Sequence, residues 1–280
     1  MTDNELKIKA AKARKLIIEA VHSAASGHPG GSLSCVDTLC TLYFDEMNID
    51  PADPKKADRD RFVLSKGHCS PALYSVLALR GFFPEENIRL FRSIEAHMSG
   101  HPDMVNVPGV DMSTGSLGQG VSAAVGMALA GKCKGESYRV YAMLGDGEIE
   151  EGQVWEAAMA AAKWKLDNLC IFVDVNGLQI DGKTADVMPS EPLDKKFEAF
   201  NFHVIKTPGH DFSAIKAALA EARQTKGQPT CVLLSTLKGK GVSFMEGQAG
   251  WHGKAPNDEQ YAIAMEELEK SLKELEEVAE

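Results

Sequence analysis

The sequence RVYAML, residues 139–144, runs directly into Gly145-Asp146-Gly147, and LCIFV, residues 169–173, is followed closely by Asn176-Gly177. Both apolar runs are continuous rather than alternating, which is typical of strands covered on both faces of a parallel sheet. Residues 150–163 between them have a helical pattern, so the segment predicts one βαβ crossover. Because a right-handed crossover brings both strand ends to the same edge of a sheet, we expect Asp146 and Asn176 to meet there.

Similar elements alternate along the rest of the chain. Further strands are expected at residues 61–65, 202–205 and 231–235, and helices at 5–26, 34–46, 121–132 and after Pro71. The pattern predicts a doubly wound, mostly parallel α/β sheet with helices on both faces. The chain shows no internal repeat and no Ser/Pro-rich linker, so we expect residues 1–280 to form a single domain. Ligands of such sheets bind in the loops outside the carboxyl ends of the strands.

The charge of the chain is concentrated at its end. After position 257 there are nine acidic residues and only two basic ones, Lys270 and Lys273, so this segment carries most of the formal net charge of −10. Apolar residues recur every three or four positions between Tyr261 and Leu275, which predicts an acidic amphipathic helix over 257–280. We expect this helix to dock on the body of the protein or on a partner, and a functional acidic motif is the less favoured alternative. The remainder is near charge balance, so nucleic acid is not an expected partner.

Cysteine usage and hydropathy point to the cytoplasm. The six cysteines include no C-x-x-C pair, which favours buried reduced thiols over a disulfide framework or a metal site. The first residues lack a basic segment followed by an apolar one, and nowhere do eighteen apolar residues run together. We therefore expect a cytoplasmic protein without a membrane-bound segment.

Asp146 and Asn176 have the chemistry of ligands for a hard metal ion. Carboxylate and amide oxygens suit Mg²⁺ or Ca²⁺ better than metals that prefer thiolates. Two side chains and one backbone carbonyl would leave coordination positions open for phosphate or water. Gly145 and Gly147 would let the backbone approach a diphosphate closely. Taken alone, however, Gly-Asp-Gly is a common turn sequence.

The wider set of motifs resembles the transketolase family. Gly145-Asp146-Gly147-Glu148, Glu151-Gly152, Trp155-Glu156-Ala157 and Asp174-Val175-Asn176 are similar, in this order, to the thiamine diphosphate signature of transketolases. Further segments that look like active-site loops of the family are, in chain order, SGHPG (26–30), LSKGH (64–68), GHP (100–102), TGSLGQG (114–120), KGKGV (238–242) and WHGK (251–254). A single histidine of this kind is more often structural, but four in family order favour a catalytic interpretation.

The resemblance implies the cofactors thiamine diphosphate and Mg²⁺, with Ca²⁺ or Mn²⁺ as substitutes for the magnesium. It implies that Asp146, Asn176 and the carbonyl of Leu178 bind the metal. It also implies a set of residues around the cofactor: Lys66, His68, Gly115, Leu117, Gly145, Asp146, Gly147, Glu151, Asn176, Lys238, His252 and Lys254. For the lysines, an ordinary solvated surface role is the alternative.

Four histidines are the implied catalytic residues. Histidine exchanges protons near neutral pH, which suits transfer at sugar hydroxyls. By resemblance, His68 and His101 lie close to the cofactor and the donor hydroxyls. His28 and His252 are better placed for proton transfer at the substrate carbonyl.

The resemblance covers only the first part of a full-length transketolase. In the family, a pyrimidine-binding domain beyond this part carries the glutamate that activates the aminopyrimidine. We therefore expect a transketolase subunit that transfers a two-carbon ketol unit between sugar phosphates, with a second subunit carrying that domain in an α₂β₂ heterotetramer. Two alternatives stay open: another thiamine-dependent subunit, for an unusual sugar or a 2-oxo acid, and a non-catalytic homologue.

Overall fold

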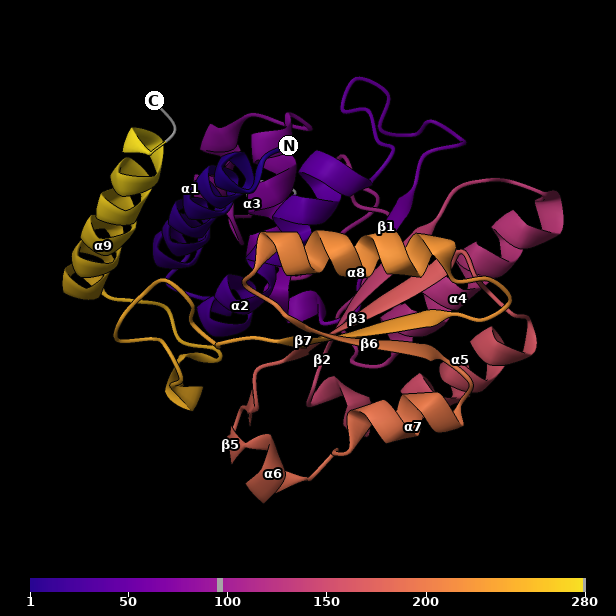
Figure 1. Ribbon diagram of the computed structural model, residues 1–280. Coiled ribbons are helices and arrows are strands. Elements are labelled where there is room, and N and C mark those ends of the chain that lie inside the picture. The colour runs from indigo at the N-terminus through magenta and orange to yellow at the C-terminus, as the bar shows by residue number, and fades with distance from the viewer. Residues whose placement is uncertain (95–97, 279–280) are drawn as a thin grey trace.

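The structure is a computed structural model that describes residues 1–94 and 98–278. Its centre is a parallel sheet in the order β1-β2-β3-β7-β6 (Figure 1). The strands are β1 (Arg61–Leu64), β2 (Val140–Gly145), β3 (Leu169–Val175), β6 (His203–Pro208) and β7 (Thr230–Ser235). All four pairings are parallel, so the carboxyl ends of the five strands lie along one edge. The predicted parallel α/β sheet is confirmed.

Helices cover both faces of this sheet. One face packs against α1 (Asp3–Ser23), α2 (Pro29–Thr41), α3 (Ser70–Arg80) and α8 (Phe212–Gln224). The other face packs against α4 (Gln119–Lys134), α5 (Gly152–Lys163) and α7 (Leu193–Ala199). Alternate residues of each strand enter the two cores: Tyr141 and Met143 point to the first, Ala142 and Leu144 to the second. The strands are therefore buried on both sides, as their continuous apolar sequences predict.

The second helix begins earlier than predicted. It starts at Pro29 rather than at residue 34, and its last turn runs into a π-helical turn at Leu42–Glu46. Proline is well suited to the first helical position because its missing N–H would have no intrahelical partner there. A Cβ on Gly30 would lie 2.9 Å from the carbonyl oxygen of Trp251, so a glycine here lets the two segments pack closely. Gly30, which the sequence analysis placed in an active-site loop at residues 26–30, is part of the helix.

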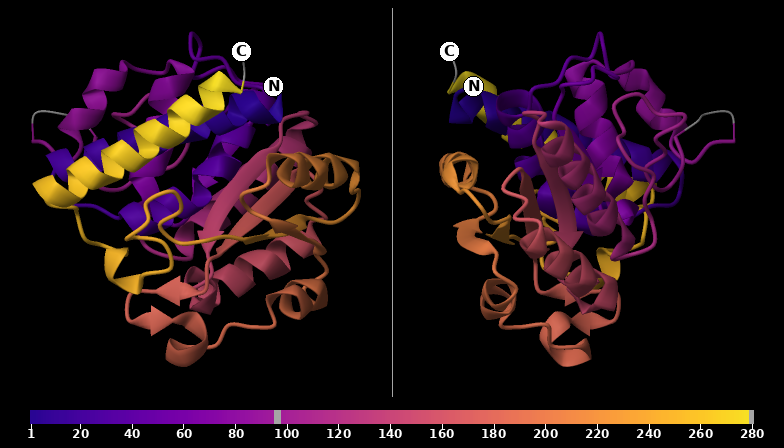
Figure 2. Two further views of the ribbon diagram at one scale, coloured as in Figure 1. Left: turned by 60° about the vertical axis from the view of Figure 1, so that its left-hand side comes forward. Right: turned by 90° about the vertical axis from the view of Figure 1, so that its right-hand side faces the viewer.

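The acidic C-terminal segment forms helix α9 (Asp258–Glu277), capped by Asn257, while residues 279–280 of the predicted helix lie outside the described part. It lies alongside α1, as Figure 2 shows, with Ala264 and Leu268 buried against that helix layer. Of the two expected docking surfaces, the body of the protein or a partner, the structure shows packing on the body. Within the described residues, no helix combines the length and apolar character needed to cross a bilayer.

Two short elements follow β3 and complete the edge of the sheet where the carboxyl ends lie. Strands β4 (Leu178–Gln179) and β5 (Gly182–Lys183) form an antiparallel hairpin, which leads into the single-turn helix α6 (Thr184–Val187). The hairpin projects beyond the sheet in Figure 2. It places Leu178 next to the loop that follows β2.

Candidate active site

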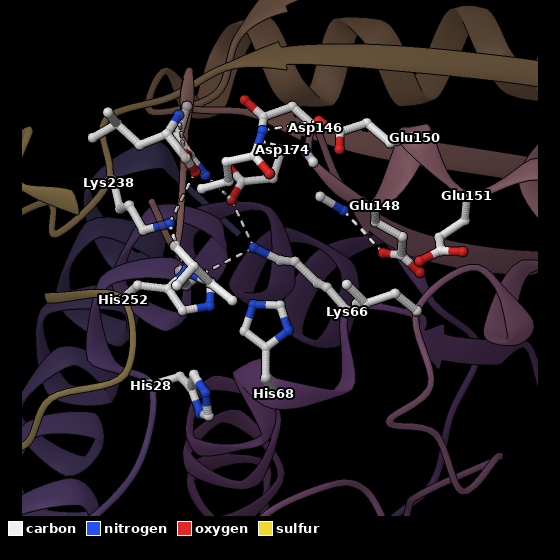
Figure 3. Close-up of a pocket in the computed structure, with 18 of the residues that line it drawn as sticks. His28, Lys66, His68, Asp146, Glu148, Glu150, Glu151, Asp174, Lys238 and His252 are labelled. Atoms are coloured by element: carbon white, nitrogen blue, oxygen red, sulfur yellow. Dashed lines mark hydrogen bonds and ion pairs between the residues drawn. The ribbon is translucent and has the colours of Figure 1, made fainter. Parts of the chain in front are cut away.

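A cavity of about 400 Å³ opens at the carboxyl edge of the sheet. Its walls come from the loops after β1, β2 and β3, from the start of α2 and from the segment after β7 (Figure 3). Most of the predicted site residues line it: His28, Lys66, His68, Gly115, Leu117, Gly145, Asp146, Gly147, Glu151, Asn176, Leu178, Lys238 and His252. His101 and Lys254 are not among the lining residues.

Asp146 is a buried carboxylate at the end of β2. Its Oδ1 accepts a hydrogen bond from the Gly147 N–H (3.0 Å) and its Oδ2 accepts one from the Gly177 N–H (2.6 Å). Burial, with a further contribution from the charge of Asp174, raises the pKa of Asp146 to about 6. A carboxylate whose charge is disfavoured in this way is stabilised by a bound cation.

Asn176 and Leu178 place two neutral oxygens beside this carboxylate. Asn176 Nδ2 donates to Asp174 Oδ2 (3.0 Å), which fixes the direction of the carboxamide, and Asn176 Oδ1 accepts from the Leu178 N–H (3.1 Å). The carbonyl oxygen of Leu178 accepts from Lys238 Nζ (3.0 Å). Carboxylate and carbonyl oxygens have further lone pairs, so these three residues fit a hard cation.

This set differs from a metal centre made of protein side chains alone. Across residues 1–94 and 98–278, no group of three or more His, Cys, Asp or Glu side chains is arranged to hold a metal ion. A cation at Asp146 would therefore need oxygens from another source. Phosphate oxygens are the usual source for Mg²⁺, which keeps few protein ligands.

Asp174, near the end of β3, is a buried acid of the cavity wall that the sequence analysis did not single out. Its Oδ2 accepts hydrogen bonds from Lys66 Nζ (2.6 Å) and Ser34 Oγ (2.5 Å), and its Oδ1 accepts one from Thr236 Oγ1 (2.5 Å). Burial alone would raise the pKa of Asp174, but the charge of Lys66 and these hydrogen bonds hold it below its usual value. The ammonium of Lys66, a predicted cofactor residue, thus donates to Asp174 and to the carbonyl oxygen of Gly31 (2.9 Å).

Glu148 is a second buried acid that joins separate loops. One of its oxygens accepts from the Ser65 hydroxyl and from the Gly118 N–H (2.9 Å), and the other accepts from the Gly145 N–H (3.1 Å). Burial raises the pKa of Glu148. The sequence assigned Glu148 only to the motif, whereas the structure shows that it ties the loops after β1 and β2 to the start of α4. Glu151, by contrast, faces the cavity from the residue before α5.

Three of the four predicted histidines form one group. The ring centroids of His28, His68 and His252 lie 5.1 to 5.4 Å apart, on the side of the cavity opposite Asp146 (Figure 3). Burial, and then the electrostatic influence of the neighbouring His68, lowers the pKa of His28 to about 4. Burial, and then the charge of Lys238, lowers the pKa of His252 to about 3. Both imidazoles are therefore neutral at physiological pH.

His101 and Lys254 lie outside this group. The His101 ring packs beside Gly115, where an added Cβ would come within 3.2 Å of the ring, so the histidine backs a residue of the cavity wall. Burial, and then the charge of Arg92, lowers the pKa of His101. Lys254 extends over the Trp251 ring, with its Nζ 5.0 Å from the ring centroid.

A parallel α/β sheet with a polar cavity at the carboxyl ends of its strands is typical of domains that bind a phosphorylated cofactor. Glycine-rich turns and a buried acid at that edge agree with this class. The chain belongs to the transketolase family: residues 6–274 match the family model for the transketolase thiamine diphosphate binding domain. The resemblance drawn from the sequence is confirmed.

Several known proteins are similar over most of this chain. The 6-deoxy-6-sulfo-D-fructose transketolase subunit of Clostridium sp. strain MSTE9 is 46% identical over 95% of this chain and 97% of its own length. An apulose-4-phosphate transketolase subunit of Phocaeicola vulgatus is 42% identical over 97% of this chain and 96% of its own length. The crystal structure of Campylobacter jejuni transketolase superimposes with a TM-score of 0.90 at 32% identity, over 98% of this chain. The chain spans 46% of that transketolase, or about half its length.

Proposed function

We propose that this chain binds thiamine diphosphate through Mg²⁺ and acts with a partner chain to transfer a two-carbon ketol unit from a ketose phosphate to an aldose phosphate. The observation that carries this proposal is the cavity itself. In a chain of the transketolase family, three imidazoles face a buried acid and two neutral oxygens across one space. Sugar chemistry needs both halves, a cofactor anchor and groups that move protons.

Asp146, Asn176 Oδ1 and the carbonyl oxygen of Leu178 would hold the magnesium ion, and Lys238 would offset phosphate charge. When bound, thiamine diphosphate supplies a nucleophilic carbon and an electron sink. Gly145 and Gly147 both line the cavity without a Cβ, which would let a diphosphate approach the backbone closely.

The histidines would exchange protons with the sugar. An ammonium can only donate, so His252 Nδ1 accepts from Lys238 Nζ (3.0 Å) and the ring carries its proton on Nε2, where it can donate to a substrate oxygen. His28 Nδ1 is buried without a hydrogen-bond partner among the described residues, so proton transfer would use the other ring nitrogen. A neutral imidazole can accept a proton from a sugar hydroxyl, and this would make His28 a general base. His68 lies beside both of these rings and would bind the cofactor or a donor hydroxyl, and His101 would support the wall at Gly115.

A partner chain would complete the site. We propose that the partner carries the pyrimidine-binding domain with its activating glutamate, and that two copies of each chain form an α₂β₂ heterotetramer in the cytoplasm. Two relatives that match over nearly their whole length are named as subunits, and the solved transketolase is about twice as long as this chain. Glu151 and the hairpin carrying Ile180, whose side chain is exposed at the cavity, are available for such a contact.

The specificity for the sugar would depend on both chains of the assembly. One relative is named for a sulfonated ketose and another for apulose 4-phosphate, so the pentose phosphate pathway is one of several settings for this chain. We propose that the residues that grip the distal anionic group lie largely on the partner. An assay of the two chains together against ketose phosphates, a 6-sulfonated ketose and a 2-oxo acid would identify the donor. If the 2-oxo acid were turned over and none of the ketoses were, ketol transfer would be refuted.

Cofactor binding is tested by calorimetry on the full chain. Asp146→Ala should abolish Mg²⁺-dependent binding of thiamine diphosphate and leave the circular dichroism spectrum unchanged, because a metal ligand is lost from an otherwise intact site. Asp53→Ala, at an exposed loop aspartate, is the matched control and should bind as the unmodified chain does. Unchanged affinity in a folded Asp146→Ala variant would remove Asp146 from the metal site.

The need for a partner is tested separately. The isolated chain should show no ketol transfer, and adding the partner should produce it together with a shift to an assembly of four chains in light scattering. Full activity from the purified chain alone would refute the two-chain proposal.

A further inference from the structure

A polar cluster outside the cavity, built around a buried carboxylate, joins α1, α2 and the segment after β6. Asp37, in α2, is 3% exposed, and its Oδ2 accepts hydrogen bonds from Arg14 Nη2 (2.7 Å) and from His210 Nδ1 (2.7 Å). Burial alone would raise the pKa of Asp37, but the charge of Arg14 and the hydrogen bond from His210 hold it below its usual value. The carboxylate is therefore ionised and binds both side chains at once.

Both side chains reach onward to the same loop. His210 Nε2 accepts from the Leu237 N–H (2.9 Å), and Arg14 Nε donates to the carbonyl oxygen of Lys240 (3.0 Å). These two backbone contacts lie on either side of Lys238. Because Nε2 accepts from a backbone N–H, the His210 proton lies on Nδ1 and points to Asp37, so the imidazole bridges the carboxylate and the loop in one orientation.

The loop has little freedom to move between these contacts. The Gly239 N–H donates to the carbonyl oxygen of Gly30 (3.0 Å). A Cβ on Gly241 would lie 2.9 Å from Arg14 Cδ, so the arginine stem packs directly against the loop backbone. Held in this way, Lys238 extends into the cavity, where its Nζ contacts both the Leu178 carbonyl oxygen and His252 Nδ1.

We infer that Asp37, Arg14 and His210 form a clamp that positions Lys238 for cofactor binding. This inference rests on the proposed function, in which Lys238 faces the diphosphate. The three are positioning residues, since none of them lines the cavity. They act by fixing the backbone of the loop and hence the place of one ammonium group between the metal-binding edge and the histidines. Supporting contacts of this kind typically change ligand affinity by roughly 10-fold or more when they are removed.

The test is a double-mutant cycle on the full chain, with the affinity for thiamine diphosphate at saturating Mg²⁺ measured by calorimetry. His210→Leu removes both hydrogen bonds and should weaken binding roughly 10-fold. His210→Gln offers a donor and an acceptor and should recover most of the affinity. His203→Leu, which removes an imidazole paired with Glu221 at the start of β6, should change nothing.

The cycle separates positioning from a general structural effect. In a Lys238→Met background, His210→Leu should no longer weaken binding, because the group that it positions is gone. The same 10-fold loss in both backgrounds, or no loss in either, would overturn the clamp while leaving the proposed function intact. Absence of binding by the unmodified chain would overturn the proposed function and the clamp with it. Arg14→Leu, on the other side of Asp37, repeats the cycle if His210→Leu does not fold.

Discussion

Replacing Lys66 by Met should destabilise the chain by about 3–5 kcal/mol, the usual cost of removing one partner of a buried ion pair. Lys66 and Asp174 have side chains that are 2% and 0% exposed, and their charged atoms are 2.6 Å apart. Without the ammonium, the Asp174 charge would be held only by two hydroxyl groups and one amide. The carbonyl oxygen of Gly31 would also lose its donor. Methionine has a similar length, so the change tests charge more than volume.

Denaturation by guanidinium chloride, followed by circular dichroism, measures this free energy of unfolding. The double variant Lys66→Met/Asp174→Asn removes both charges and should be more stable than the sum of the single effects by about 1–3 kcal/mol. Lys195→Met, which breaks an exposed pair with Glu198, should cost less than about 1 kcal/mol. A loss below about 1 kcal/mol for Lys66→Met, or strict additivity in the double variant, would refute the assignment of Lys66 as the counter-ion that keeps Asp174 ionised.

Three further predictions concern the histidines, the Lys238 loop and the C-terminal helix. In an NMR titration of the unliganded chain, His28 and His252 should stay neutral above pH 5, because their pKa values are lowered to about 4 and about 3; midpoints near 6.5 would contradict the burial argument. Gly239→Ala should cost about 1–3 kcal/mol, since φ is +81° and the new Cβ would lie 2.3 Å from a carbonyl oxygen. Gly227→Ala, at φ +74° with no atom within 4 Å, should cost less, and equal losses would disprove the role of the contact. Leu268→Ala should cost about 2–5 kcal/mol by opening a cavity between α9 and α1, and an unchanged denaturation midpoint would show that α9 adds nothing to stability.

The sequence was a good guide where the structure depends on local pattern. The ends of strands β2 and β3 lie within two residues of the predicted positions. A short, continuous apolar run between polar turns is compatible with few secondary structures other than a buried strand. The shared edge of Asp146 and Asn176 followed from the handedness of a single crossover. These residues directly follow the ends of β2 and β3, and the Gly177 N–H donates to Asp146.

The sequence was a poor guide where a residue acts through distant partners. Asp174 follows an apolar strand and looked like part of a motif, but it is bonded to Lys66 and Ser34, which lie 108 and 140 positions away. Asp37 and His210 are 173 positions apart and share no local pattern at all. Their pairing depends on how α2 and the end of β6 pack over the sheet, and periodicity carries no information about that packing.

The two halves of the site differ in the same way: one depends on local strand ends, and the other on residues that are distant in the sequence. The proposed metal-binding half is made from the ends of β2 and β3 and the hairpin of β4 and β5, so its geometry is set by the backbone of adjoining elements. The histidine half collects His28, His68 and His252 from three loops, and no shared strand fixes their spacing. Lys238 is the residue that contacts both halves, through the Leu178 carbonyl oxygen and His252. On the proposed roles, a displaced Lys238 would disturb cofactor binding and the protonation of His252 together, and a clamp on its loop would prevent that displacement.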